Sequence, residues 1–242
     1  VSRKASLLQS ASAVGIEAAK ATVDRLGARK INTANVPVLL HRDIASSLFG
    51  HYVGAISGGS LYRRSSFLLD SLGKQVFPEW LNIEERPFIK GGLASSSFDN
   101  EGVACSDMTI VDGGKLATYL YTTYSSRKLN TRSNGHAGGI HNWLVGDTGH
   151  SDADLLKEMG TGLFVTELMG QGVNGVTGDY SRGAAGYWVE NGIIQYPVHE
   201  VTIAGNLKDM FKGIVAIGAE KDVRGSVQTG SVLIDQMKIA GS

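Results

Sequence analysis

The chain of 242 residues has 23 basic and 23 acidic side chains, so it has no formal net charge at pH 7, and it is long enough to bury a sizeable core. Because no basic run is longer than Arg63-Arg64 or Arg127-Lys128, the composition argues against nucleic-acid binding along a basic stripe. The single cysteine, Cys105, excludes an internal disulfide, and no segment approaches the roughly 20 apolar residues of a membrane span; we therefore expect a cytoplasmic protein.

The first 58 residues predict a helix, a strand and a second helix. Apolar residues near helical spacing indicate a helix over 13–26, and the short apolar run 36–40 indicates a buried strand. The second helix is expected over 44–56, with Asp43 as its N-cap and the pair Gly58-Gly59 as its end.

Residues 59–242 predict mainly strands. One hairpin is expected from 108–111 and 115–123, because Asp112-Gly113-Gly114 between them suits a tight turn. A second is expected around Glu190-Asn191-Gly192. Further strands are expected at 164–168, 201–204, 214–217 and 232–239. A helix is expected from Ser151 to Met159, with Asp154 completing a capping box, and a short helix at 207–211 after Asn206.

The fold class follows from the order of these elements. Long helices do not alternate with strands after residue 60, which argues against a doubly wound parallel sheet. Glycine makes up 32 of the 242 residues, well above the usual share of roughly 7 per cent, as expected for a chain with many tight turns. The sequence predicts an α+β fold that is predominantly β, with twisted, mostly antiparallel, barrel-like sheets and a few helices at their edges.

Four segments carry a resemblance to a known family. Residues 170–206 read GQGVNGVTGDYSRGAAGYWVENGIIQYPVHEVTIAGN; the others are SGGSLYRRSSFLLDSLGKQV at 57–76, NGHAGGIHNW at 134–143 and SVQTGSVL at 226–233. In this order they resemble the TldD/TldE (PmbA) family, and its TldE branch in particular. The resemblance implies that residues 1–242 are the C-terminal domain, a helix-strand-helix lead-in followed by the mainly β part. It also implies an N-terminal domain of similar size, absent from this chain, in keeping with a first residue of Val1.

The resemblance also implies a lost metal site. The catalytic TldD branch has a His-Glu-x-x-x-His helix motif and a downstream cysteine that bind zinc, with the glutamate as general base. Aligned on Gly50-His51, this chain has Ser46 and Ser47 at the first histidine and the glutamate, and Thr229 at the cysteine. Hydroxyls are poor zinc ligands. We therefore expect no catalytic residue and no metal in this chain, and interpret His51 as a packed helix residue in preference to a residual ligand.

The glycine-rich segment 134–143 allows three interpretations. His136 and His141 could bind a metal, although their spacing is not a recognised one. They and Asn142 could face a peptide or partner across a loop that Gly138 and Gly139 open to close approach. Alternatively, the loop is structural, with an internally bonded histidine.

Asp179, Tyr180 and Arg182 form a polar cluster inside the second glycine-rich segment. They are candidates for the same cleft or interface, or Asp179 and Arg182 make a local ion pair that fixes a loop. Residues 170–175 mimic a dinucleotide-binding fingerprint, but no helix follows them, so nucleotide binding is not expected. Cys105 has no histidine near it in the sequence, and we expect a small packed residue.

The resemblance thus implies the TldE/PmbA subunit of a cytoplasmic heteromeric zinc metallopeptidase. Such complexes cleave unstructured peptides, among them antibiotic leader peptides and an antitoxin, and the family was first described as a modulator of DNA gyrase. Zinc is expected in a TldD-like partner. The other expected partners are a peptide substrate and further copies of the chain in a homo-oligomer. Direct contact with nucleic acid or with a membrane is not expected. Two alternatives stay open, an independently active metallopeptidase and a non-enzymatic scaffold that modulates gyrase.

Overall fold

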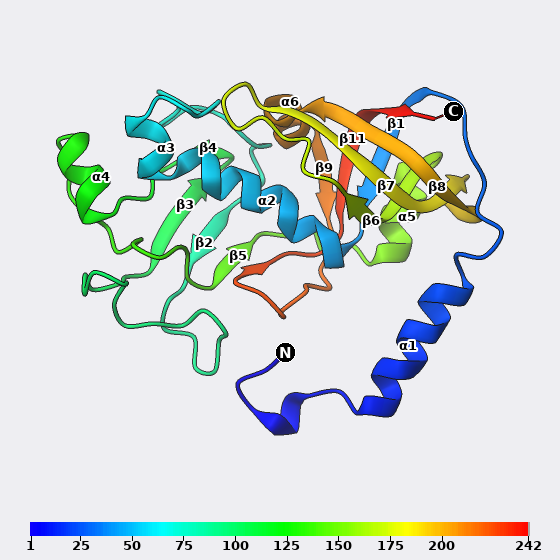
Figure 1. Ribbon diagram of the computed structural model, residues 1–242, viewed down its shortest axis with the longest axis horizontal. Coiled ribbons are helices and arrows are strands. Elements are labelled where there is room, and N and C mark those ends of the chain that lie inside the picture. The colour runs from blue at the N-terminus through cyan, green and yellow to red at the C-terminus, as the bar shows by residue number, and fades with distance from the viewer. Residues whose placement is uncertain (242) are drawn as a thin grey trace.

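The computed structural model describes residues 1–241, with two sheets on either side of a central helix, α2 (Arg42–Ile56) (Figure 1). The larger sheet has the strand order β1-β6-β7-β8-β11-β9, and β1 also pairs with β11, which closes β1, β6, β7, β8 and β11 into a barrel. The smaller sheet has the order β10-β5-β2-β3-β4. This α+β, predominantly β fold confirms the predicted fold class.

The barrel strands are mostly antiparallel, and the pairing of β1 with β6 is parallel. The hairpin of β7 and β8 turns as predicted at Asn191 and Gly192, which both have positive φ, as a tight two-residue turn requires. The strands span β1 (Ala34–Leu40), β6 (Gly162–Met169), β7 (Asp179–Glu190), β8 (Ile193–Asn206), β9 (Ile214–Ile217) and β11 (Val232–Ala240).

The smaller sheet is built from short strands and long irregular connections. Its strands are β2 (Ile83–Glu85), β3 (Met108–Asp112), β4 (Lys115–Leu116), β5 (Trp143–Val145) and β10 (Val227–Gln228). The predicted strand over 115–123 is wrong beyond Leu116. At its end Thr122 and Ser125 form a reciprocal capping box that starts helix α4 (Thr123–Lys128) instead.

The structure differs from the prediction at both ends of the helix expected over 44–56. His41, not Asp43, is the N-cap of α2, because its Nδ1 accepts the backbone N–H of Asp43. The helix ends at Ile56, and Gly58 does not stop it but begins a new helix, α3 (Gly58–Tyr62), capped by Ser57. The capping box of Ser151 and Asp154 is confirmed in α5 (Asp152–Met159), and α6 (Leu207–Lys212) starts at Asn206 as predicted.

Near the N-terminus, the 3₁₀ turn η1 (Ala5–Leu7) precedes helix α1 (Ala11–Val23), which stands away from the body of the molecule (Figure 1). None of the residues of α1 is buried, so its apolar side chains do not form the buried face expected from their spacing. Across residues 1–241, no helix is both long and apolar enough to cross a bilayer.

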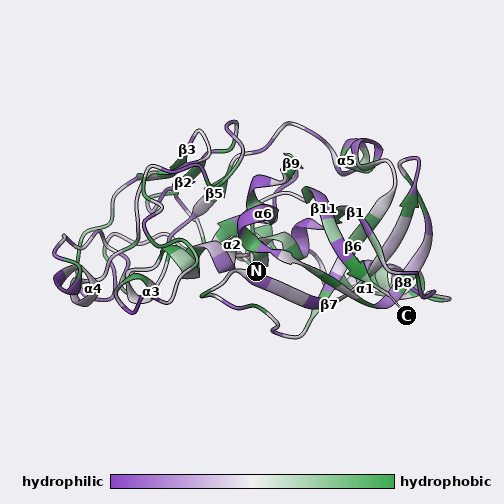
Figure 2. Cartoon of the chain, turned by 90° about the horizontal axis from the view of Figure 1, so that it is seen from above, coloured by the Kyte–Doolittle hydropathy of each residue, from purple (hydrophilic) through white to green (hydrophobic). Residues whose placement is uncertain are grey.

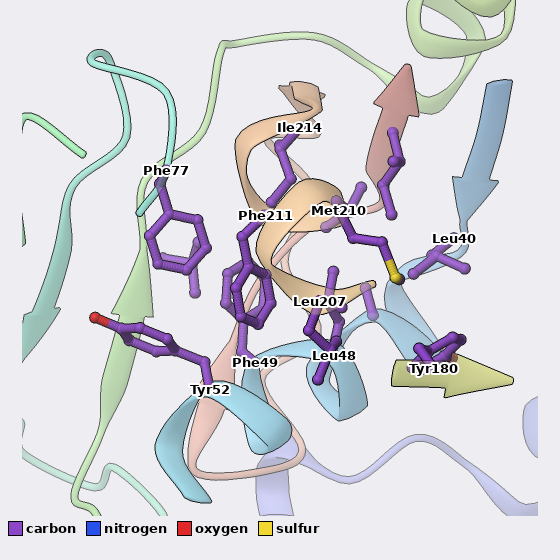
Figure 3. Close-up of a cluster of buried hydrophobic side chains, with 14 of the residues drawn as sticks. Leu40, Leu48, Phe49, Tyr52, Phe77, Tyr180, Leu207, Met210, Phe211 and Ile214 are labelled. Carbon is purple, nitrogen blue, oxygen red and sulfur yellow. The ribbon is translucent and has the colours of Figure 1, made fainter. Parts of the chain in front are cut away.

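The core joins α2 to α6 through aromatic side chains (Figure 3). The ring centroids of Tyr52 and Phe77 lie 4.9 Å apart, as do those of Phe77 and Phe211, and Leu48 and Phe49 of α2 are also fully buried or nearly so. In Figure 2 strand β6 of the barrel has an apolar colour, whereas α4 has a hydrophilic one. Packing of this face against α6 leaves the opposite face of α2, with Gly50 and Gly54, exposed to solvent.

Candidate functional site

A hollow of about 320 Å³ lies beside the exposed face of α2. Gly50, His51 and Gly54 contribute to it from α2, where Gly54 is four residues from Gly50 and three from His51 and so lies beside both. Nothing lies within 4 Å of a Cβ built at either glycine, so another chain can approach the helix backbone closely here. The remaining lining comes from Ala55, Ser60, Ser65, Phe67, Gln171, Val173, Gly175 and Leu207.

His51 is half-buried in this wall and lacks co-ligands. Its ring meets the ring of Tyr180 edge-on at 6.0 Å, and within the described part of the chain its buried Nε2 has no hydrogen-bond partner. Burial lowers the pKa of His51, and the positive charge of Arg182 lowers it further, so the imidazole is largely neutral at pH 7.

The residues that replace the zinc motif serve local structure. The Ser47 hydroxyl donates to the carbonyl of Ile44 at 2.7 Å, and the fully buried Thr229 hydroxyl donates to the carbonyl of Gly230. In residues 1–241 no group of three metal-binding side chains includes His51. The residues present at α2 therefore do not fit a zinc ion.

A His-Glu dipeptide does occur in the chain, at His199-Glu200. It lies in strand β8, where successive side chains point to opposite faces, and not on a helix. It cannot reproduce the geometry of a helix motif.

Strand β7 divides the predicted polar cluster between its two faces. Asp179 accepts hydrogen bonds from Thr177 and Asn206, which lower its pKa, and the predicted ion pair with Arg182 is absent from the described residues. The reason is strand geometry: side chains three positions apart point to opposite faces. Tyr180 and Arg182, two positions apart, share the face toward His51.

A second group of candidates gathers at the end of the smaller sheet around Glu85, which is 1% exposed. One carboxylate oxygen is 2.6 Å from His136 Nε2, and the other is 2.7 Å from His141 Nδ1 and also accepts the His141 backbone N–H. Burial favours the neutral acid, but these bonds and the charge of His136 outweigh it and hold the pKa of Glu85 below its ordinary value.

The hydrogen-bond pattern fixes a proton on His136. Asn134 Oδ1 lies 2.9 Å from His136 Nδ1 and is an acceptor, because it already accepts from the backbone of Tyr121 while its amide nitrogen donates to Tyr119. His136 Nδ1 must therefore donate. Its Nε2 lies 2.6 Å from the Glu85 carboxylate, so the ring bridges Asn134 and Glu85.

Cys105 is a small buried residue, as expected, and it belongs to this network through a histidine that is distant in the sequence. Its Sγ lies 3.2 Å from His141 Nε2, 36 residues along the chain. Burial raises the pKa of the thiol, and the carboxylates of Asp99 and Glu85 raise it further. The thiol is thus protonated and not a reactive thiolate, and it also lies within hydrogen-bonding reach of the Gly135 carbonyl.

The interpretation that the side chains of segment 134–143 face a peptide or a partner is wrong for His136, His141 and Asn142. His136, His141 and Asn142 are buried and bonded internally, so they cannot present themselves to a substrate. Gly138 and Gly139 are exposed at the loop tip, with φ of 100° and 127°, which favour glycine.

Sequence reasoning missed Glu85. Its partners lie 51 and 56 residues further along the chain, and only the pairing of β2 with β5, which sets Glu85 opposite Trp143, brings them together. The available signal was an acidic residue two positions after the apolar Ile83, on the same face of a short strand.

Comparison with known proteins assigns this fold to the C-terminal domain of a metallopeptidase family. The family model described as the PmbA/TldA metallopeptidase C-terminal domain matches residues 33–241. The metalloprotease PmbA of Escherichia coli O157:H7 is 57% identical over 241 residues, covering 100% of this chain and 54% of that protein. The chain belongs to the PmbA/TldE family of metallopeptidases.

Solved structures agree with this assignment. A putative modulator of DNA gyrase from Thermotoga maritima superposes with a TM-score of 0.91 at 31% identity, covering 99% of this chain and 57% of that one. TldE from Thermococcus kodakarensis shares the fold, with a TM-score of 0.84 at 20% identity over 95% of this chain and 55% of that one. The chain spans about half the length of the curated relatives that it matches.

Proposed function

We propose that this chain is the C-terminal domain of the non-catalytic, TldE-like subunit of a cytoplasmic, heteromeric zinc metallopeptidase that cleaves unstructured peptides. A TldD-like partner supplies the zinc, the attacking water and the general base. The observation that carries the proposal is the chemistry of α2, where Ser46, Ser47 and a lone His51 occupy the places of the motif.

The exposed face of α2 supports a role for this subunit in assembly or in shaping the cleft. Gly50, Gly54 and Gly175 line the hollow beside His51 without side chains of their own. An extended peptide or a partner segment can therefore approach by its backbone, a mode that needs little sequence selectivity. The candidate interface includes this hollow together with Arg182 and the exposed tip at Gly138 and Gly139, whereas Tyr180, predicted as an interface residue, is 2% exposed and packs in the core.

An independently active metallopeptidase is the second candidate, because the ligand atoms of Glu85, His136 and His141 all lie within 4.8 Å of one another. The separations favour hydrogen bonds over metal coordination. Ligands about 2.0 to 2.1 Å from a tetrahedral zinc stand further apart from each other than the 2.6 and 2.7 Å between Glu85 and the two rings. The protons between these groups take the place of an ion.

A scaffold without proteolytic function is the third candidate. It is favoured by the similarity to the Thermotoga maritima protein, which is described as a putative modulator of DNA gyrase. If this candidate is correct, mixing this subunit with a TldD-like partner would add nothing to peptide cleavage.

Zinc analysis and cleavage assays separate the three candidates. We expect well under one zinc per chain after dialysis, and cleavage of an unfolded peptide only when the TldD-like partner is present. One zinc per chain that is lost in both His136→Gln and His141→Gln, with cleavage by this chain alone, would establish the second candidate. Cleavage by the partner alone at the rate of the mixture would favour the scaffold.

A further inference from the structure

The two short basic runs of the sequence meet in space at one end of the molecule. Helices α3 and α4 pack together, and the rings of Tyr62 and Tyr124 contact edge-on with centroids 5.6 Å apart. Arg63 and Arg64 at the end of α3 thereby lie near Arg127 and Lys128 at the end of α4. All four are exposed, and α4 has a hydrophilic colour in Figure 2.

These cations lack acidic partners. Among residues 1–241, the ion pairs of basic side chains lie elsewhere, and none involves Arg63, Arg64, Arg127 or Lys128. Unpaired like charges held close together repel one another. An anionic ligand would relieve that repulsion.

A hollow of about 450 Å³ lies at this end, with Arg64 and Lys128 in its wall and Asp70 as the acidic residue of its lining. A neighbouring hollow of about 300 Å³ shares Leu69 with it. The second hollow has Lys74, Lys208 and Lys212 in its wall and no acidic residue among those that line it.

The second hollow continues toward the candidate functional site. It shares Phe67 with the hollow beside His51. On α6, Leu207 lines the hollow beside His51 and its neighbour Lys208 lines the second hollow. The segment 60–76 thus lines all three hollows in succession. The two hollows that share Leu69 are here called the basic surface, and their basic side chains are Arg64, Lys74, Lys128, Lys208 and Lys212.

We propose that the basic surface binds an acidic segment of an extended polypeptide. Its cations are spread along a line and separated by Leu69, Phe67 and the tyrosines, which suits carboxylates that alternate with apolar side chains. That this segment belongs to a substrate whose remainder reaches the hollow beside His51 rests on the proposed function; the binding itself does not.

Single-stranded nucleic acid fits this surface less well. Such ligands stack bases on free aromatic faces, but the Arg63 guanidinium lies over the ring of Tyr62 at 5.3 Å and the Lys128 ammonium over that of Tyr124 at 5.6 Å. The exposed ring faces are already in contact with cations, so the surface offers charge and not stacking.

The test measures binding to the isolated chain by fluorescence anisotropy. The probes are a labelled ten-residue peptide of alternating glutamate and alanine, the same peptide with glutamine for glutamate, and a ten-nucleotide oligothymidylate. Two variants remove basic side chains from the two hollows, K74Q/K208Q/K212Q from the smaller one and R64Q/K128Q from the larger one. A matched control, K4Q/K90Q/K238Q, removes three exposed lysines from other parts of the surface.

We expect the glutamate peptide to bind at least tenfold more tightly than the other two probes, and more weakly as salt rises. Each surface variant should weaken this binding tenfold or more, whereas the control should change it less than twofold. Equal binding of the glutamine peptide, equal weakening in the control, or tighter binding of the oligonucleotide would overturn the proposal. If the acidic peptide bound but the complex cleaved no peptide, the result would count against the proposed function alone. If the complex cleaved peptide but the acidic peptide did not bind, the result would count against the basic surface alone.

Discussion

At the scale of single residues, Glu85 organises the most polar part of the interior. Its carboxylate holds His136 and His141, and through His141 it also fixes Cys105. Removing one member of a buried charged pair leaves the others uncompensated, which costs about 3–5 kcal/mol. This network is thus a structural element that secures the loop 134–142 to the smaller sheet.

Glu85→Gln should lower the free energy of unfolding by about 3–5 kcal/mol, because the carboxylate that accepts from both histidines is lost. Urea denaturation followed by circular dichroism measures it. The neighbour Glu84, whose half-exposed side chain pairs with Arg86, is the control: Glu84→Gln should cost no more than about 1 kcal/mol. Equal losses in the two variants would show that the buried network contributes little.

The stability should also fall in acid because of Glu85. Its folded-state pKa lies below the ordinary value, so the unfolded chain takes up this proton at a higher pH than the folded chain does. The contribution is complete above about pH 4.5, near the ordinary glutamate pKa, and is lost as the pH falls through the lower folded pKa. Melting temperatures from pH 6 to pH 3 should drop less steeply in Glu85→Gln; parallel curves would refute this.

His51→Ala should leave peptide cleavage by the assembled enzyme within about threefold of the wild-type rate, because one imidazole without co-ligands cannot hold a catalytic ion. Replacement of the motif glutamate in the TldD-like partner should abolish cleavage in the same assay. If His51→Ala abolished turnover while the complex still assembled, this histidine would have a chemical role that the structure gives no reason to expect.

At the scale of elements, local signals in the sequence predicted what local chemistry determines. The turn at Asn191-Gly192, the capping box of α5 and the start of α6 depend on residues close in the chain, and all were predicted. The strand expected over 115–123 ends at Leu116, and the capping box of α4 accounts only for Thr122 and Thr123 at the far end of the predicted range. Barrel closure through β1 and β11, and the network at Glu85, arise from pairings between distant residues that no short pattern encodes.

Substitutions at two glycines test two features of the helices. Gly54 tests the exposed face of α2, and Gly58 tests the packing of α3 on α4. Gly54→Ala should raise the free energy of unfolding by about 0.8–1 kcal/mol, because the added Cβ meets no atom within 4 Å and alanine has the higher helix propensity. Gly58→Ala should lower it by about 1–3 kcal/mol, since its Cβ would lie 2.7 Å from the Ser125 Cβ and 3.0 Å from the Leu120 carbonyl oxygen. Denaturant titrations of both variants measure these changes in the free energy of unfolding. A Gly58→Ala variant more stable than the wild type would contradict the packing of α3 on α4.

At the scale of the whole molecule, the glycine-rich surfaces should meet another chain. Gly138 and Gly139 are poor probes, since their positive φ strains any substitution. Gly175 has no such constraint and open space around it. Gly175→Gln should therefore weaken heteromer formation or cleavage at least fivefold while melting and circular dichroism stay unchanged. Normal assembly and cleavage would remove this hollow from the functional surface.

The division of labour between a zinc-free subunit and a zinc-bearing partner is tested most directly by one experiment on purified, dialysed proteins. Zinc content and cleavage of an unfolded peptide are measured for the full-length form of this subunit, for a TldD-like partner and for their mixture. We predict well under one zinc per chain and no cleavage for this subunit alone, and full cleavage in the mixture with all zinc traced to the partner. One zinc per chain together with cleavage by this subunit alone would contradict that division.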